Sequence, residues 1–309
     1  MTHNKSTFYL DLVSGVSSIT QPLLWFFQVD GRDNPKLVSV QFERYPVHCG
    51  RFSTDGSELL VGSRNHPHFY SYDLMDGKIT KINANQGLDQ THTKLFEMSP
   101  CGRYVALLGR WGAVHLLTAR TKEWVSTLQM TGNVASLSFS SNGSHLYTYG
   151  ETGEVWVWDI ASRSCIHRFA DEGSFGGECV AVSPSGRFIA CGSQAGIVNL
   201  YERDEAFRPA IDGCSRPSPA YTIGNLTTPI TSLLFDPTSE LLVLASEHKA
   251  EAIRIAHLPS RSVYCNFPGF NSKLNKTLCM DISPHGGYLT VGDNKGNANL
   301  FRLVFVLLY

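Results

Sequence analysis

A short turn pattern recurs six times along the chain and limits the folds open to it. The pattern is an apolar residue, then Ser or Asp, two further residues and usually Gly. Its copies are FSTDG at Phe52, MSPCG at Met98, FSSNG at Phe139, VSPSG at Val182, FDPTSE at Phe235 and ISPHG at Ile282. They begin 46, 41, 43, 53 and 47 residues apart. A period of this length indicates that one supersecondary unit is repeated.

Two short apolar runs follow each turn at a nearly constant distance. From the turn glycine to the end of the second run there are 17, 16, 16, 16 and 16 residues in the five copies that have the glycine. Short runs bounded by Gly, Pro, Asn and Ser are typical of strands, and helical periodicity is absent. A single four-stranded meander cannot bury both of its faces, whereas several such sheets stacked around an axis bury their faces against one another. We therefore predict an all-β fold, a β-propeller.

The repeats predict seven blades, because 309 residues divided by a period of about 43 gives a value close to seven. Residues 21–309 form the predicted propeller domain, and residues 1–20 are left unassigned. PLLWFFQVDG and KLVSVQFERY suit a third and a fourth strand, so the first blade is expected to be incomplete, with two strands missing. The C-terminal LVFVLLY could supply an edge strand that helps to close the ring. A six-blade ring in which KLVSVQF completes the last blade is the alternative.

The stretch GEVWVWD, at Gly153–Asp159, raises the question of a ligand-stacking site. Trp156 and Trp158 alternate with two valines, so both indoles point to one face of a strand. Large aromatic side chains at such positions bury much apolar area. We expect them to pack on a neighbouring blade rather than on a ligand.

Composition argues against several classes of function. With 26 basic and 27 acidic residues the chain has no overall field that would attract nucleic acid or anionic membranes, so any such contact must be a local patch. The eight cysteines form no zinc-type spacing and are expected to be reduced thiols. The N-terminus does not have the features of a secretory signal, and the apolar C-terminal run is too short for a membrane helix. The pattern predicts an intracellular protein.

Motifs for catalysis are missing from the sequence. It has no nucleophile elbow, no HExxH helix and no P-loop. The residues before each repeated turn are expected on the innermost strands, where a propeller enzyme would have its active site; they are Arg51, Glu97, Ser138, Ala181, Leu234 and Asp281. They contain no Ser-His-Asp set and no arginine cluster. We expect no enzyme, cofactor, metal or small-molecule substrate, and we interpret His66 and His68 as solvated turn residues rather than metal ligands.

Four cations fall in the turns between the second and third strands of their repeats: Arg64, Arg110, Lys249 and Lys295. These turns share one face of a propeller. The four side chains are therefore candidates for a patch that contacts phosphate or an acidic partner. An ordinary solvated rim is the alternative.

EVWVWD and SPSGRFIACGSQAGIVNLY resemble blades of the WD-repeat propeller family. The chain departs from the family pattern because it has no Gly-His dipeptide, and only Asp73 and Asp159 keep the aspartate that ends the third strand. The usual His-Asp hydrogen-bond network is therefore expected to be missing. Apolar packing should contribute more to these blades.

Further stretches are similar to one branch of that family, the U3 small nucleolar RNA-associated protein 18 branch of the small-subunit processome. They include FFQVDGRDNPK, the RFADEGS loop at Arg168–Ser174, ITSLLFDPTSELLVLASE and AIRIAHLPS. The resemblance implies a nucleolar scaffold in ribosome biogenesis and ribosomal RNA processing. Its partners would be other propeller and scaffold proteins, with pre-ribosomal RNA and U3 small nucleolar RNA contacted mainly through the complex. A WD-repeat adaptor elsewhere, such as a substrate receptor for ubiquitination, is the alternative, and location discriminates between them.

Overall fold

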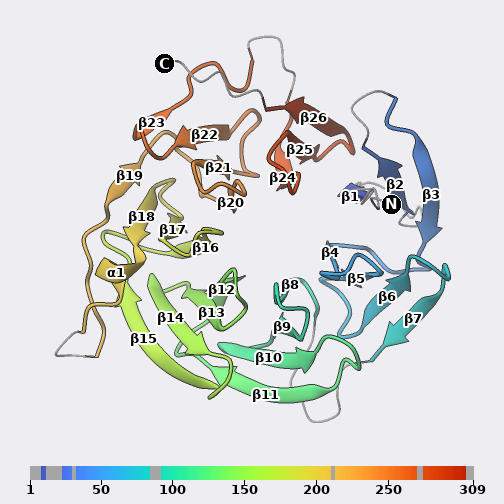
Figure 1. Cartoon of the computed structure of the whole chain (residues 1–309), viewed down its shortest axis with the longest axis horizontal. Helices are drawn as coiled ribbons and strands as arrows, with labels where there is room; N and C mark the ends of the chain where they lie inside the picture. Colours follow the sequence, from blue (N-terminus) through green and yellow to red (C-terminus); the bar gives the residue numbers. More distant parts are fainter. Residues whose placement is uncertain are drawn as a thin grey trace, which may run out of the picture.

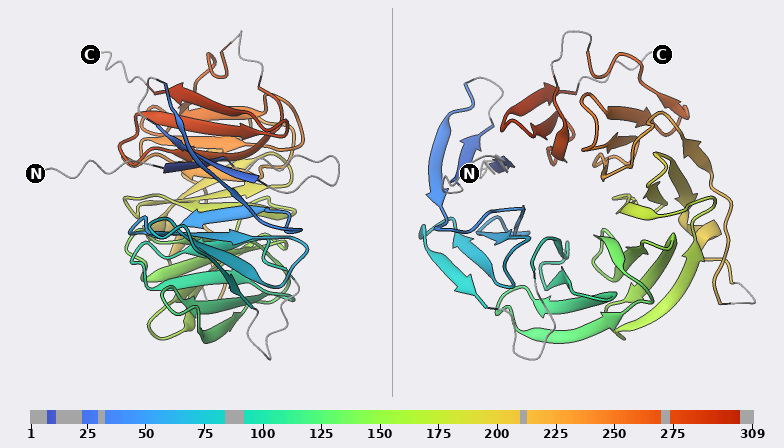
Figure 2. Two further views of the ribbon diagram at one scale, coloured as in Figure 1. Left: turned by 90° about the vertical axis from the view of Figure 1, so that its right-hand side faces the viewer. Right: turned by 180° about the vertical axis from the view of Figure 1, so that it is seen from behind.

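The strands of the chain form a ring of antiparallel sheets. The computed structural model describes residues 8–11, 23–29, 33–83, 92–209, 213–269 and 274–303. Its strands make seven sheets around one axis, and strands that follow one another in sequence are paired in space (Figure 1). Figure 2 shows the ring edge-on and from behind. Six sheets carry the repeated turn and the seventh precedes them, so the predicted all-β propeller is confirmed.

The sheets are numbered here in chain order. Sheet 1 contains β1 (Phe8–Asp11), β2 (Leu23–Gln28) and β3 (Lys36–Gln41). Sheet 2 contains β4 (Cys49–Phe52), β5 (Glu58–Gly62), β6 (Phe69–Asp73) and β7 (Ile79–Ile82). Sheet 3 contains β8 (Phe96–Met98), β9 (Tyr104–Leu108), β10 (Ala113–Thr118) and β11 (Trp124–Gln129). Sheet 4 contains β12 (Val134–Phe139), β13 (His145–Gly150), β14 (Glu154–Asp159) and β15 (Ser164–Ala170).

The second half of the ring continues the pattern. Sheet 5 contains β16 (Gly177–Val182), β17 (Phe188–Ser193), β18 (Val198–Glu202) and β19 (Tyr221–Ile223). Sheet 6 contains β20 (Ser232–Phe235), β21 (Leu241–Ala245), β22 (Ile253–His257) and β23 (Ser262–Val263). Sheet 7 contains β24 (Thr277–Ile282), β25 (Tyr288–Asp293) and β26 (Ala298–Arg302). A one-turn helix, α1 (Arg203–Ala206), follows β18, and no helix in the described ranges is long and apolar enough to cross a membrane.

The repeated turn has one geometry in all six copies. In the first copy Gly56 adopts a φ of 71°, and its N–H donates to the carbonyl of Ser53. The hydroxyl of Ser53 accepts a hydrogen bond from the N–H of Glu58, five residues on, at 2.9 Å. The same i to i+5 bond is made by Ser99, Ser140, Ser183, Asp236 and Ser283. The Ser or Asp of the motif thus closes the hairpin with its side chain.

Alternate residues of each strand pack into different cores. On β14, Trp156 and Trp158 join a cluster that includes Leu116 and Leu128 of sheet 3. Val155 and Val157 join another that includes residues of sheet 5. Both indoles are buried, and they stack at 5.6 Å between ring centroids. The prediction of core packing for the two tryptophans is therefore confirmed.

Six clusters of buried side chains occupy six of the seven junctions of the ring. They join sheets 1 and 2, 2 and 3, 3 and 4, 4 and 5, 5 and 6, and 6 and 7. Within the described ranges no such cluster joins sheet 7 to sheet 1. Among the described residues, this junction is therefore the one with the least apolar packing.

Sheet 1 differs from the expectation of two strands. β1 falls in the segment left unassigned and pairs with β2, so the sheet has three strands. Lys36–Gln41 pairs with β2 and not with sheet 7, so it does not complete the last blade as the six-blade alternative required. Sheet 7 also has three described strands. The predicted edge strand at 304–309 lies outside the described residues.

The two aspartates that keep the family position bind turns instead of a histidine. The carboxylate of Asp73 accepts hydrogen bonds from the N–H groups of Met75 and Asp76. That of Asp159 accepts one from the N–H of Ser162 at 2.7 Å. Each aspartate thereby closes the turn between the third and fourth strands of its sheet.

Candidate functional site

The connections between strands divide the propeller into two faces. One face carries the turns between second and third strands together with the links from one sheet to the next, and we call it the crossover face. A Cβ added to Gly112, in the β9–β10 turn, would lie 2.2 Å from the carbonyl oxygen of Gly132, in the link to sheet 4. One added to Gly153 would lie 3.2 Å from the carbonyl oxygen of Ser174, in the link to sheet 5. Turns and links therefore alternate in direct contact along this face.

All four predicted cations lie on the crossover face and are exposed. Arg64 is in the β5–β6 turn, Arg110 in β9–β10, Lys249 in β21–β22 and Lys295 in β25–β26. The structure places them in two groups rather than one, on sheets 2 and 3 and on sheets 6 and 7. Two lysines in the links between sheets, Lys94 and Lys276, complete the groups. The sequence pattern did not single them out.

Lys94 connects the cations of the first group. Arg64 donates through Nε to Nε2 of His48 at 2.8 Å. Burial, with the charges of Arg64 and Lys94, lowers the pKa of His48 to about 4. Burial and the charges of Lys94 and Arg110 likewise lower the pKa of His92. Burial is the larger cause of both shifts, and the charges of Arg64, Lys94 and Arg110, on adjacent turns and links, act in the same direction.

Lys276 has the same place in the second group. It forms an isolated bridge with Ala250, next to Lys249, and its carbonyl accepts a hydrogen bond from the N–H of Asn294, next to Lys295. A hollow of about 680 Å³ lies beside this group. Its lining mixes Lys249 and Arg254 with Glu251, so the charge of the second group is partly balanced.

A smaller hollow of about 240 Å³ adjoins the first group. Lys94 and Arg110 line it together with Trp111, Asn133 and Glu151. The indole of Trp111 is 71% exposed, and the guanidinium of Arg110 lies 5.5 Å from its ring centroid. Sequence reasoning missed Trp111, although a Trp-Gly pair between two strands was a visible signal.

An ion pair joins the innermost strands of sheets 2 and 3. Nε of Arg51, on β4, lies 3.0 Å from Oε2 of Glu97, on β8, and the charge of Glu97 raises the pKa of Arg51. Asp281, on the innermost strand β24, is exposed; desolvation raises the pKa of its carboxyl group, and the hydrogen bond from the N–H of Ile282 and the charge of Arg51 oppose this shift. The sequence placed these residues on the innermost strands correctly, and the Arg51–Glu97 pair forms because sheet 3 packs against sheet 2.

His66 and His68 pack around Tyr45. The ring centroids of both imidazoles lie 5.2 Å from that of Tyr45, whose hydroxyl donates to the carbonyl of His68 at 2.9 Å. The described ranges contain no group of three or more His, Cys, Asp or Glu side chains arranged to hold a metal ion. The two histidines therefore belong to a packed aromatic cluster rather than to a freely solvated turn.

Comparison with known proteins agrees with the geometry. The WD domain, G-beta repeat family matches residues 123–159 and 164–202, which cover sheet 4 and most of sheet 5. The U3 small nucleolar RNA-associated protein 18 homolog of Mus musculus is 42% identical over 94% of this chain, and that of Homo sapiens is 41% identical over 90%. The chain is a WD-repeat propeller homologous to U3 small nucleolar RNA-associated protein 18. The Saccharomyces cerevisiae protein of that name is 27% identical over 91% of the chain.

The homology covers nearly all of the chain but only part of each relative. The chain spans about half the length of the curated relatives it matches, 51% of the mouse protein and 49% of the human one. A chain in the crystal structure of the Mitotic Checkpoint Complex has the same fold, with a TM-score of 0.72 over 92% of this chain and 82% of that one. At 18% identity, that likeness concerns the fold alone.

Proposed function

We propose that this chain is a non-catalytic scaffold of the small-subunit processome. The observation that carries the proposal is homology over 94% of the chain to a protein whose name associates it with U3 small nucleolar RNA. The rigid ring offers two faces and a rim to partners, as a scaffold requires. On this proposal the chain resides in the nucleolus and supports pre-ribosomal RNA processing and small-subunit assembly.

Protein partners make most of the contacts in this proposal. The net charge of the chain is −1, so it has no long-range attraction for a polyanion. Its cations on the crossover face fall into two small groups, one of them partly balanced by acidic side chains. Pre-ribosomal RNA and U3 RNA are therefore contacted mainly through the other propeller and scaffold proteins of the complex.

The contact between the innermost strands of sheets 2 and 3 supports a non-catalytic role. Arg51 on β4 and Glu97 on β8 neutralise each other in an ion pair between two innermost strands. A scaffold needs only surfaces that bind partners, and the ion pair between the innermost strands suits a structural role.

The test is to express the tagged chain in cells and to measure its location and its RNA. We expect nucleolar staining, co-precipitation of U3 small nucleolar RNA, and accumulation of unprocessed pre-ribosomal RNA when the endogenous protein is depleted. A cytoplasmic or nucleoplasmic protein that co-purifies with ubiquitin ligase subunits and lacks U3 RNA would instead support an adaptor of another pathway.

A further inference from the structure

The crossover face presents two exposed aromatic side chains on rigid supports. Trp111 lies in the β9–β10 turn, and Phe175, 94% exposed, lies in the link between sheets 4 and 5. The turns and links that lie between Trp111 and Phe175 are in contact, since Gly112 packs against Gly132 and Gly153 packs against Ser174. Together with the first cation group they form one continuous surface, here called the basic-aromatic arc, made of Arg64, Lys94, Arg110, Trp111 and Phe175.

Trp111 occupies a backbone position that disfavours a large side chain. Its φ is 53°, and that of Gly112 is 81°. The N–H of Ala113 donates to the carbonyl of Arg110 at 2.9 Å and closes a two-residue turn with both central residues in the left-handed region. Asn, Asp and Gly suit the first of these positions, whereas a bulky residue there is strained. Strain of this kind is typical of functional positions.

The strained turn is also held firmly. The carbonyl of Trp111 accepts a hydrogen bond from Nε2 of Gln129 at 2.6 Å. The backbone of Gly112 lies against that of Gly132, and Gly112 carbonyl accepts the N–H of Met130 at 2.9 Å. The indole therefore projects from a fixed base and loses little conformational entropy on binding a partner.

The link that carries Phe175 is fixed by a buried carboxylate. Asp171 accepts hydrogen bonds from the hydroxyls of Tyr149 and Tyr201, both at 2.6 Å. Asn199 donates through Nδ2 to Asp171 at 2.9 Å and to the carbonyl of Glu172 at 2.8 Å. The link between sheets 4 and 5 is thus fixed at its base and exposes the ring of Phe175 to solvent. An exposed aromatic side chain on a fixed support is typical of an anchor residue in a protein interface.

We propose that the basic-aromatic arc binds an extended acidic segment of a protein partner that also carries apolar or aromatic residues. Its carboxylates contact Arg64, Lys94 and Arg110, and its apolar side chains contact Trp111, the adjoining hollow and Phe175. Charge complementarity indicates the acidic part, since Arg64, Lys94 and Arg110 are exposed cations on adjacent turns and links of sheets 2 and 3. The proposal deepens the scaffold function and rests on it.

The surface favours a peptide over a nucleic acid. Glu151, in the β13–β14 turn, lines the same hollow as Trp111, and its carboxylate accepts a hydrogen bond from Nδ2 of Asn133 at 3.1 Å. A phosphate backbone that ran the length of the arc would meet this negative charge. A peptide can instead place acidic residues on the cations and neutral ones beside Glu151.

The experiment measures binding of defined polymers to the purified full chain. The probes are a glutamate–tyrosine copolymer, polyglutamate, a lysine–tyrosine copolymer and oligouridylate, followed by tryptophan fluorescence and by anisotropy of labelled probe. We expect the glutamate–tyrosine copolymer to bind more tightly than the other three. Trp111→Asn and Arg110→Glu should each raise its Kd by about 10-fold or more, as for anchor residues of an interface.

Two controls separate binding from folding and from general charge. Trp111→Asn should melt at the same or a higher temperature, because Asn suits the left-handed position. Trp124→Ala, on the outer strand β11, and Lys276→Ala, in the second cation group, should leave the Kd unchanged. Copolymer binding that is absent, or equal in the wild type and Trp111→Asn, overturns the proposal. Tighter, Trp111-dependent binding of oligouridylate assigns the arc to nucleic acid and also overturns it.

The assay and the test of the processome function fail independently. Loss of the copolymer result leaves nucleolar location and U3 co-precipitation untouched. A chain outside the nucleolus that still binds the copolymer through Trp111 would keep the arc and refute its place in the processome.

Discussion

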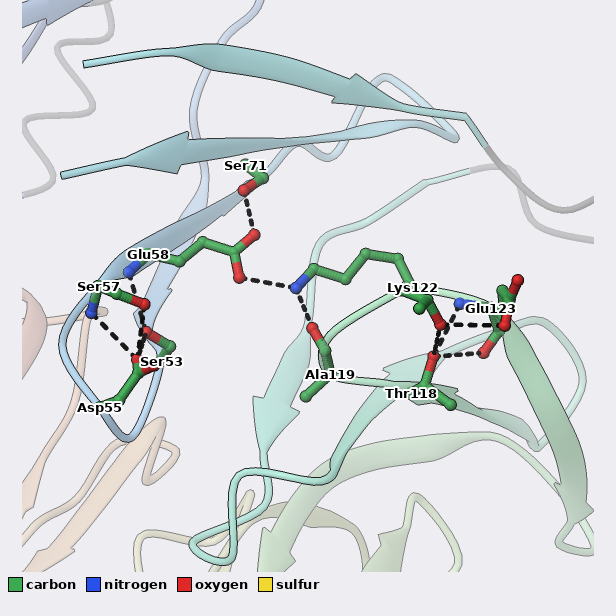
Figure 3. Close-up of polar contacts among 10 residues, drawn as sticks. Ser53, Asp55, Ser57, Glu58, Ser71, Thr118, Ala119, Lys122 and Glu123 are labelled. Carbon is green, nitrogen blue, oxygen red and sulfur yellow. Dashed lines mark hydrogen bonds and ion pairs between the residues drawn. The ribbon is translucent and has the colours of Figure 1, made fainter. Parts of the chain in front are cut away.

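Nζ of Lys122 lies 2.7 Å from Oε2 of Glu58 and joins sheet 3 to sheet 2 (Figure 3). The Lys122 side chain is only 6% exposed, and its ammonium also donates to the carbonyl of Ala119. The other oxygen of Glu58 accepts from the hydroxyl of Ser71. A lysine in the β10–β11 turn is thus held by the neighbouring blade, 64 residues away in sequence.

Lys122→Met should destabilise the fold by roughly 2–4 kcal/mol, because the partly buried Glu58 would lose its cation and Lys122 would lose its buried ion pair. Chemical denaturation measures the change. The double variant with Glu58→Gln should recover part of the loss, since it removes the uncompensated charge. Arg187→Met breaks the exposed pair with Glu202 and should change stability by less than about 0.5 kcal/mol. Equal losses for the two single variants would contradict the importance of the inter-blade pair.

Trp158→Ala should destabilise the fold by roughly 3–5 kcal/mol. Its indole is buried against sheet 3, and its Nε1 donates to the hydroxyl of Thr148 at 3.0 Å. The same change at the half-exposed Trp124 should cost much less. Thermal melting compares the two, and an unchanged melting temperature for Trp158→Ala would show that this side chain is not part of the core.

His48 should make stability depend on pH. Its pKa is lowered to about 4 from 6.5, so between these values the unfolded chain binds a proton that the folded chain does not. Stability should therefore fall as pH falls from about 6.5 to 4 and then level off. His48→Gln should make the slope in this window smaller, as measured by urea denaturation at several pH values, whereas a change of the exposed His248 should not. An unchanged slope in His48→Gln would exclude His48 as its source.

The hydrogen bonds of the Asp171 carboxylate should both stabilise the fold and restrict the motion of residues 171–176. Burial raises its pKa, and the hydrogen bonds from Tyr149 and Tyr201 oppose that shift. Tyr201→Phe should cost roughly 1–3 kcal/mol, because a buried acceptor loses a donor. Hydrogen exchange should quicken at Glu172, whose N–H donates to the Tyr201 hydroxyl at 2.8 Å. Tyr221→Phe is the matched control, and slower exchange or equal stability in Tyr201→Phe would argue against the coupling.

Sheet 1 should promote self-association. Trp25 and Leu37 are 42% and 48% exposed, and within the described ranges no buried cluster covers the side of sheet 1 that faces sheet 7. Exposed apolar groups beside strand edges favour pairing with other chains. Trp25→Ser with Leu37→Lys should raise the monomer fraction in sedimentation at high concentration, and Met75→Ser, at an exposed turn, should not. An equal effect of both changes on the monomer fraction would show that the surface responsible for self-association lies elsewhere.

The periodic features of the sequence were enough to predict the blades. The Ser or Asp of each repeated turn accepts a bond from the residue five positions on, so its effect is local and repeats wherever the motif occurs. The alternation of Trp156 and Trp158 with valines likewise fixes two opposite faces of one strand. Such features depend only on neighbours in the chain.

Contacts between blades were decided by the tertiary structure. Lys94 and Lys276 complete the two cation groups from links rather than turns, and Lys122 reaches Glu58 in the preceding blade. These pairs are far apart in sequence and meet only because the sheets stack around an axis with fixed spacing. The sequence therefore determined the repeated unit and the face of each turn, and the stacking of neighbouring sheets determined which charges lie side by side.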